Sequence, residues 1–241
     1  MTLFRHPADR WPVAVFVAFF AIELTIYLTV DNPLLLLLAF GLSIVPKASI
    51  CAFNHHHQHL ATFKPEWANR LLEAMYGLQV GVTSHAWVLH HSVGHHQNYL
   101  DQTKDESRWA RDDGSKMGEL EYSFWTTVTA YPRAWEVSAR FPKFRRTFLW
   151  MGILHVVLTA GLVYYRPVPG LIMFVLAPLF FLFGTAWVTY AHHAGRSTAT
   201  HFVASNNMLT PMYNFVTGNL GYHTAHHYRP GVHWSKLKEL H

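Results

Sequence analysis

The stretch VPGLIMFVLAPLFFLFGTAWVTYA, residues 168–191, contains no charged side chain and is followed directly by two histidines. A helix that spans a bilayer needs about 20 consecutive apolar residues, so this stretch predicts a membrane span. Three similar apolar runs occupy residues 11–30, 33–53 and 147–165. We therefore expect an all-α membrane protein with four transmembrane helices.

Short turns join the four runs into two helical hairpins. The residues DNP at 31–33 connect the first two runs, and RPVPG at 166–170 connects the last two. These turns hold a single basic residue, whereas residues 60–146 hold eleven Lys and Arg. Because basic residues concentrate in cytoplasmic loops, we expect residues 60–146 and both termini to lie in the cytoplasm.

The composition limits the classes of protein that the chain can represent. Only 14% of its residues are charged, against about 25% in soluble domains. We attribute the net charge of +5 to cytoplasmic loops and not to nucleic-acid binding. The single cysteine, Cys51, excludes an intrachain disulfide and a fused iron–sulfur module, which would need about four thiolates. We expect one domain over residues 1–241, without a cleavable signal peptide.

Two further helices are expected between the hairpins. Residues 71–89 are apolar but interrupted by Glu73, Gln79 and two glycines, so we expect an interfacial or re-entrant helix that does not cross the membrane. Residues 119–140 are expected to form a cytoplasmic amphipathic helix.

Most of the 19 histidines fall in four clusters at or just beyond the expected cytoplasmic ends of apolar runs. The clusters are NHHHQH at 54–59, HHSVGHH at 90–96, TYAHHAG at 189–195 and GYHTAHH at 221–227. Residues i, i+3 and i+4 share one face of a helix, and several of these histidines have that spacing. The clusters can therefore direct imidazoles toward a common centre.

Two or three imidazoles from each of three clusters, with His193 from the other, give nine, which are too many for one metal ion and suit two. A zinc ion takes three or four protein ligands. Imidazole binds iron, copper, nickel and zinc, and redox chemistry with dioxygen favours iron. A metal-buffering loop or a transporter site would need only one such cluster, and bis-histidine haem ligation would leave most of them unexplained. Isolated histidines are expected to be ordinary core or surface residues; they are His6, His85, His155 and His201.

The motifs HHHQH, HSVGHH and HTAHH, with a further histidine at the end of the last apolar run, resemble the three histidine boxes of the membrane fatty acid desaturase and hydroxylase superfamily. The stretch GNLGYHTAHHYRPGVHWSKL is similar to the third box of bacterial desaturase-like proteins. The second box and the TKDES that follows it are closer to membrane alkane monooxygenases. The resemblance covers most of the chain, from about residue 12 to residue 240.

This resemblance implies four transmembrane helices under a cytoplasmic helical cap that holds a histidine-ligated di-iron site. It also implies dioxygen as co-substrate and an apolar substrate. The implied iron ligands are His55, His59, His91, His95, His96, His193, His223, His226 and His227. Three of these assignments stay open because another histidine is adjacent. His56 and His57 lie beside the pair His55 and His59. His90 competes with His91, and His192 competes with His193.

Other polar residues are candidates for supporting roles. Three carboxylates that follow the second box could accept hydrogen bonds from ligating histidines; they are Asp101, Asp105 and Glu106. Glu23 and His155, inside apolar runs, are candidates for the substrate channel. The basic run RFPKFRR at 140–146 could dock an acidic electron donor or lipid headgroups.

We expect an oxygen-dependent di-iron desaturase of the bacterial inner membrane that acts on a fatty acyl or similar long apolar chain. The alternatives are an acyl or alkane hydroxylase, an oxidative decarboxylase and, outside enzymes, a metal transporter or sensor. Thr189 stands where acyl-CoA desaturases carry an asparagine, which weakens the transfer of their mechanism. Because no cytochrome b5-like domain is fused to the chain, we expect electrons from a separate ferredoxin, rubredoxin or cytochrome b5 type protein with its reductase.

Overall fold

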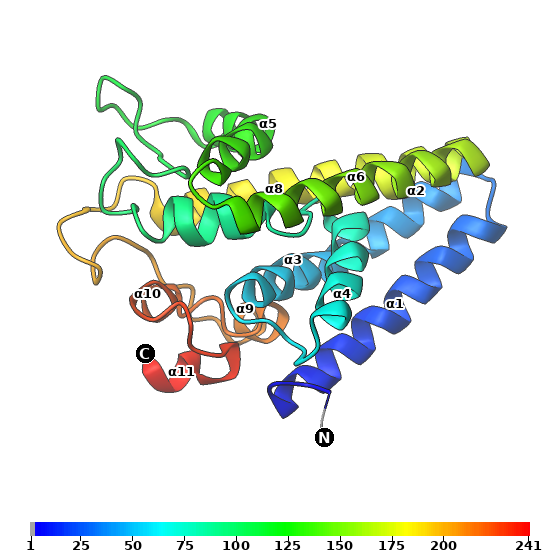
Figure 1. The fold of residues 1–241 in the computed structure, drawn as a ribbon, viewed down its shortest axis with the longest axis horizontal. Helices are drawn as coiled ribbons and strands as arrows, with labels where there is room; N and C mark the ends of the chain where they lie inside the picture. Colours follow the sequence, from blue (N-terminus) through cyan, green and yellow to red (C-terminus); the bar gives the residue numbers. More distant parts are fainter. Residues whose placement is uncertain (1–2) are drawn as a thin grey trace.

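The computed structural model describes residues 3–241, and its regular elements are helices (Figure 1). Strand-like pairing within this described part is limited to two isolated bridges, Phe4 with Phe63 and Ala110 with Lys116. The elements in chain order are η1 (Pro7–Asp9), α1 (Arg10–Thr29), α2 (Pro33–Leu42), α3 (Ile44–His59), α4 (Glu66–Val80), η2 (Val88–His95), α5 (Glu119–Ser138), α6 (Pro142–Tyr165), α7 (Pro167–Leu171), η3 (Ile172–Leu176), α8 (Ala177–His193), α9 (Pro211–Thr217), α10 (His223–Tyr228), η4 (Trp234–Lys236) and α11 (Leu237–Leu240). The expected all-helical fold is confirmed.

Long apolar helices give the protein three or four candidate membrane spans. Three helical stretches are long and apolar enough to cross a membrane; they are Pro7–Thr29, Pro142–Tyr165 and Pro167–His193. The fourth candidate is α2 with α3, taken together as one bent span. These helices expose large apolar side chains such as Leu34, Trp150 and Val156, and such surfaces suit contact with lipid and not with water.

The second apolar run is bent, although the sequence suggested one continuous span. The axes of α2 and α3 differ by 54°, with Ser43 at the junction. Pro46, in the first turn of α3, lacks the N–H that would bond to the carbonyl of Leu42, and its ring crowds that carbonyl. The Ser43 hydroxyl donates to the carbonyl of Phe40 at 2.7 Å. Beyond this bend α3 continues to His59 and so carries the first histidine cluster.

The prediction of a single helix over residues 71–89 is wrong. α4 ends at Val80, and Gly81 then adopts a left-handed conformation with φ of 73°. A Cβ on Gly81 would lie 2.7 Å from the carbonyl oxygen of Pro178 in α8, so only glycine fits this approach of two backbones. A separate π-helix, η2, begins at Val88 and carries the second histidine cluster.

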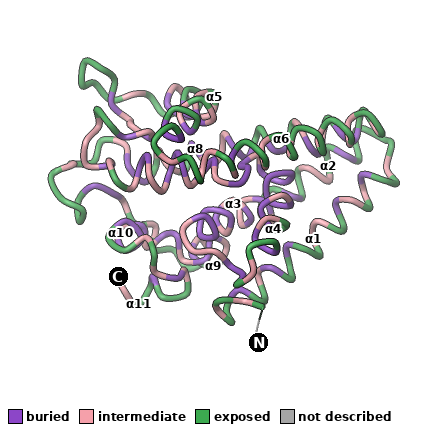
Figure 2. Tube along the Cα trace, in the orientation of Figure 1, coloured by how far each residue is buried: buried purple, intermediate pink, exposed green. Residues whose placement is uncertain are grey.

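The helix expected over residues 119–140 is present as α5, which packs against α8 and η2. α4 lies against α3, α6 and α8. Figure 2 shows many buried positions along α3, α4 and α10, whereas α1 and α6 are mainly exposed or half-buried along their length. Most histidines of the four clusters are buried, and His59 and His96 are partly buried.

Candidate metal centre

Four elements bring the four histidine clusters together. The C-terminal end of α3 carries the first cluster and η2 the second; α8 ends with the third, and α10 holds the fourth. The nine histidines implied as ligands form two adjoining groups. The groups touch where the ring of His96, from the first, stacks on the ring of His227, from the second, at a centroid distance of 4.1 Å.

The first group has five members, each of which offers one ring nitrogen within 4.8 Å of all the others; they are His55, His59, His91, His96 and His226. Three Nε2–Nε2 distances are short: 2.7 Å from His55 to His91, 3.0 Å from His91 to His96, and 3.1 Å from His96 to His226. Two nitrogens that bind one ion at about 2.0–2.1 Å and at right angles would lie about 3 Å apart. The group therefore has the spacing of ligands around a single ion.

The second group consists of His95, His193 and His227, whose ring nitrogens also lie within 4.8 Å of one another. His223 joins this group, because its Nε2 lies 2.9 Å from the Nε2 of His193. Four imidazoles are thus available to a second ion.

Hydrogen bonds hold two rings of the second group by their outer nitrogen. The Nδ1–H of His95 donates to Asp105 Oδ1 at 2.7 Å, and the Nδ1–H of His193 donates to the carbonyl of Ala204 at 3.1 Å. Such a bond fixes the tautomer and leaves Nε2 as a lone-pair donor toward the centre. Metal-binding histidines are usually held in this way.

Several inner nitrogens are buried without a hydrogen-bond partner among residues 3–241. They are Nε2 of His59, Nε2 of His95 and the lone-pair nitrogen of His227, neither of whose ring nitrogens has a partner. A buried polar atom without a partner costs about 1–3 kcal/mol. A metal ion would satisfy these lone pairs, so the donor set fits metal ions and suits imidazole-binding metals such as iron.

Burial keeps the imidazoles neutral. It lowers the pKa of His91, His96 and His226 well below the ordinary value, and neighbouring histidines lower it further. The pKa values of His223 and His227 are lowered for the same reasons. Neutral imidazoles at pH 7 are the form that binds a metal ion.

The neighbouring histidines that the sequence left open lie outside both groups. His56 donates from Nε2 to the carbonyl of Thr217 at 3.0 Å. His57 accepts from the backbone N–H of Thr62 and donates from Nε2 to Glu73 at 3.1 Å.

His192 and His90 are also directed elsewhere. His192 has Asn206 O 2.9 Å from Nδ1 and Tyr213 Oη 3.1 Å from Nε2. His90 stacks on Trp87 at a centroid distance of 5.6 Å, and neither of its ring nitrogens has a partner among the described residues.

The three carboxylates after the second box have different positions. Asp105 is buried and bonds to His95. Asp101 is at the surface, where it accepts from Thr103 and pairs with Lys104. The side chain of Glu106 packs against Gly94, where an added Cβ would lie 2.5 Å from its Cγ, and burial raises the pKa of the Glu106 carboxyl.

Sequence reasoning missed two groups that support the histidines. The carbonyl of Ala204 fixes His193, and no side-chain pattern marks a backbone acceptor. Glu73 accepts from His57 and also bonds to Ser84 and Arg70. The signal for Glu73 was a carboxylate inside an otherwise apolar stretch.

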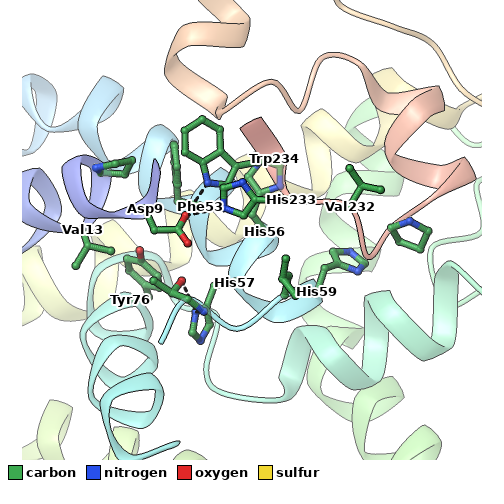
Figure 3. A pocket seen from close by; sticks show the side chains of 14 residues that line it. Asp9, Val13, Phe53, His56, His57, His59, Tyr76, Val232, His233 and Trp234 are labelled. Atoms are coloured by element: carbon green, nitrogen blue, oxygen red, sulfur yellow. Dashed lines mark hydrogen bonds and ion pairs between the residues drawn. The ribbon is translucent and has the colours of Figure 1, made fainter. Parts of the chain in front are cut away.

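Hydrogen bonds join the segment around Asp9 to the segment around His233 beside the first histidine cluster. Figure 3 shows a cleft in which Asp9 faces His233 and Trp234, close to His56 and His59. His233 donates from Nε2 to Asp9 at 3.0 Å, and the indole N–H of Trp234 donates to the same oxygen at 2.7 Å. The N-terminal η1 is thereby fixed to η4.

An apolar cavity of about 350 Å³ reaches the histidines. Residues of α3, α8 and α9 form most of its walls, and His55, His91 and His223 contribute to its lining. Two hydroxyls, of Thr185 and Thr189, are among the few polar groups in the walls, and Thr189 donates its hydroxyl to the carbonyl of Thr185.

Neither residue predicted to line the channel lies in this cavity. Glu23 pairs with Lys47 at 2.8 Å and lines a separate cavity. His155 lies against Gly77, where its Nδ1 would be 3.4 Å from an added Cβ.

Comparison with known proteins supports the resemblance. No curated protein and no solved structure matches the chain. The sequence model of one family, described as fatty acid desaturase, matches residues 32–241, which include all four histidine clusters. The chain therefore belongs to the fatty acid desaturase family, within the superfamily of membrane desaturases and hydroxylases.

Proposed function

We propose that the protein is an oxygen-dependent di-iron desaturase that introduces a double bond into a fatty acyl or similar long apolar chain. The observation that carries this proposal is the apolar cavity of about 350 Å³ that ends on His55, His91 and His223. A cavity of this size is in the range of small-molecule sites. It would place methylene groups beside the histidine centre.

Two iron ions would be held by the nine histidines. The ligands of one ion would be His55, His59, His91, His96 and His226, and those of the other would be His95, His193, His223 and His227. When bound, the two ions would supply the dioxygen activation needed to remove hydrogen from an unactivated methylene, with electrons delivered by a separate donor protein. Overall, one dioxygen, two electrons and two protons would turn a CH2–CH2 unit into CH=CH and two waters.

The protein's own residues position the reactants. The walls contributed by α3, α8 and α9 exclude water and hold an alkyl chain across the histidines. Asp105 fixes the ring of His95 and brings one negative charge to a set of neutral donors. The carbonyl of Ala204 fixes His193 in the same way.

The proposed arrangement in the membrane follows from the apolar helices. The spans α1 with α2–α3 and α6 with α7–α8 would form two hairpins, and α4, α5 and α9–α11 a cytoplasmic cap, all within one domain over 1–241. The basic segment 60–146 would place the cap and both termini in the cytoplasm, at a bacterial inner membrane. A separate protein of the ferredoxin, rubredoxin or cytochrome b5 type would supply electrons.

Hydroxylation is the second candidate. The second histidine box and the TKDES after it are closer to alkane monooxygenases, and the structure packs Glu106 of this segment tightly on Gly94. In that case one oxygen atom would be added to the chain in place of hydrogen removal. Oxidative decarboxylation would give a terminal alkene and carbon dioxide.

Mass spectrometry of lipids and volatiles from cells that express the protein would test the proposal. The comparison is wild type with His95→Ala, and with His241→Ala at the exposed C-terminal position as the matched control. We expect a product lighter by two hydrogens in wild type and His241→Ala and not in His95→Ala. A product with one added oxygen would identify a hydroxylase, and zinc without iron in the purified protein would favour a transporter or sensor.

A further inference from the structure

A second cavity, of about 220 Å³, lies apart from the cavity that reaches the histidines, and the two share no lining residue. It is enclosed by side chains of α1, α2, the first turn of α3, η3 and α8. Its walls are apolar except for Glu23, Ser43 and Lys47. Ile22 and Leu42, which also line it, are largely exposed on the lipid-facing surface.

The polar end of this cavity is a buried ion pair inside the candidate membrane spans. The Glu23 carboxylate and the Lys47 ammonium lie 2.8 Å apart, and their side chains are 6% and 1% exposed. Lys47 also donates to the carbonyl of Gln79 at 3.1 Å. Charged side chains within a membrane are costly and in most cases serve a function.

The ion pair leaves hydrogen-bonding capacity unused. Within residues 3–241, Glu23 Oε2 is buried and has no partner. The Lys47 ammonium has three N–H donors, of which two are directed to Glu23 and Gln79, and the Phe181 ring lies 6.0 Å away. Ser43 cannot supply the missing donor, because its hydroxyl already donates to Phe40.

We propose that this cavity binds a long aliphatic chain that ends in a hydroxyl group. A hydroxyl both donates and accepts, so it would donate to Glu23 Oε2 and accept the remaining N–H of Lys47. The apolar walls would take the first carbons of the chain, which would enter from the lipid beside Ile22 and Leu42. A carboxylate-ended chain would bring a second negative charge next to Glu23 and is disfavoured.

Photolabelling of the purified protein in phosphatidylcholine nanodiscs tests this inference. The probes are a diazirine-bearing octadecanol and the matched diazirine-bearing octadecane, and peptide mass spectrometry maps the labelled residues. The octadecanol probe should label α1 and α2 around Ile22 and Phe40, and excess palmitate should not compete. Neither readout needs iron or turnover, so this result is independent of the proposed desaturase activity.

Two pairs of variants define the site. Glu23→Leu with Lys47→Met replaces the ion pair by apolar groups of similar size, a change that proteins often tolerate. It should lower octadecanol labelling about tenfold, since the hydrogen bonds to the hydroxyl are lost. Ala39→Leu, which narrows the cavity, should also reduce labelling, whereas Gly41→Leu, which adds bulk in open space on the same helix, should not.

Three outcomes would overturn the inference. Equal labelling of these residues by octadecanol and octadecane would mean that any lipid chain fills the cavity. Unchanged octadecanol labelling in the double variant would remove the role of the ion pair. Absence of label from the cavity residues in wild type would remove the site.

Discussion

Asp105 illustrates how one side chain can set the properties of a histidine centre. It is 1% exposed and accepts from the Nδ1–H of His95, while the backbone N–H of Ser107 donates to the same oxygen. The carboxylate therefore holds one ring in place and makes its inner nitrogen a better donor. Asp101, four residues earlier, is at the surface, where its carboxylate accepts from Thr103 and pairs with Lys104.

The first prediction concerns this carboxylate. Asp105→Asn should lower the affinity for iron about 10- to 100-fold, because partners of metal-bound histidines contribute on this scale. Iron titration of the purified metal-free protein measures the effect. Asp101→Asn is the matched control and should bind iron as wild type does; equal affinities of the two variants would exclude the proposed role of Asp105.

The second prediction concerns His90 and pH. Burial, together with the nearby Arg133 and His95, lowers the pKa of His90 to about 3. Below pH 6.5 the unfolded chain binds a proton at this position that the folded chain does not bind, so stability falls as the pH falls. Between pH 7.5 and pH 5 the loss is about 2 kcal/mol.

Thermal unfolding of the metal-free protein at pH 7.5 and pH 5 measures this loss. The Tm of His90→Phe, whose ring can still stack on Trp87, should fall less between the two pH values than the Tm of wild type. His241→Phe at the exposed C-terminus is the control. An equal fall in Tm for His90→Phe and wild type would contradict the account.

At the scale of elements, α8 forms one wall of the proposed substrate cavity, and Gly184 contributes no side chain to that wall. A Cβ at Gly184 would meet no atom within 4 Å, and the residue lines the cavity. Gly184→Leu should therefore shorten the chain that the cavity accepts. We expect the rate with the longest substrates to fall at least about tenfold, with iron content unchanged.

Gly161→Leu is the control for this third prediction. A Cβ at Gly161, on α6, would also meet no atom within 4 Å, but Gly161 is exposed and does not line the cavity. Product chain lengths measured by gas chromatography should match wild type for Gly161→Leu. A Gly184→Leu enzyme with an unaltered product profile would show that the chain binds elsewhere.

The helices were predictable where their apolar residues alone determine them. The runs at 147–165 and 168–191 correspond to α6 and to α7–α8. The break in the helix after Val80 was not predictable from the sequence. Gly81 is required there because its backbone approaches Pro178, which is distant in sequence. The bend near Pro46 has a local cause in the sequence, but its size of 54° depends on packing in three dimensions.

At the scale of the whole molecule, helical spacing and the family resemblance together implied nine histidines, and the structure brings these nine side chains into two groups. Helical periodicity is a local property, so it can be read from sequence. The choice of Asp105 among three nearby carboxylates, and of the Ala204 carbonyl, depends on how distant segments pack. The same is true of the proposed substrate cavity, most of whose walls come from three separate helices.

The central claim is that the two histidine groups hold two iron ions. The most direct test is the iron content of the purified wild-type protein, measured by plasma mass spectrometry beside His59→Ala and His227→Ala, which remove one member of each group. The account predicts about two irons per chain in wild type and a lower content in each variant. Stoichiometric zinc without iron, or an iron content that neither variant lowers, would contradict it.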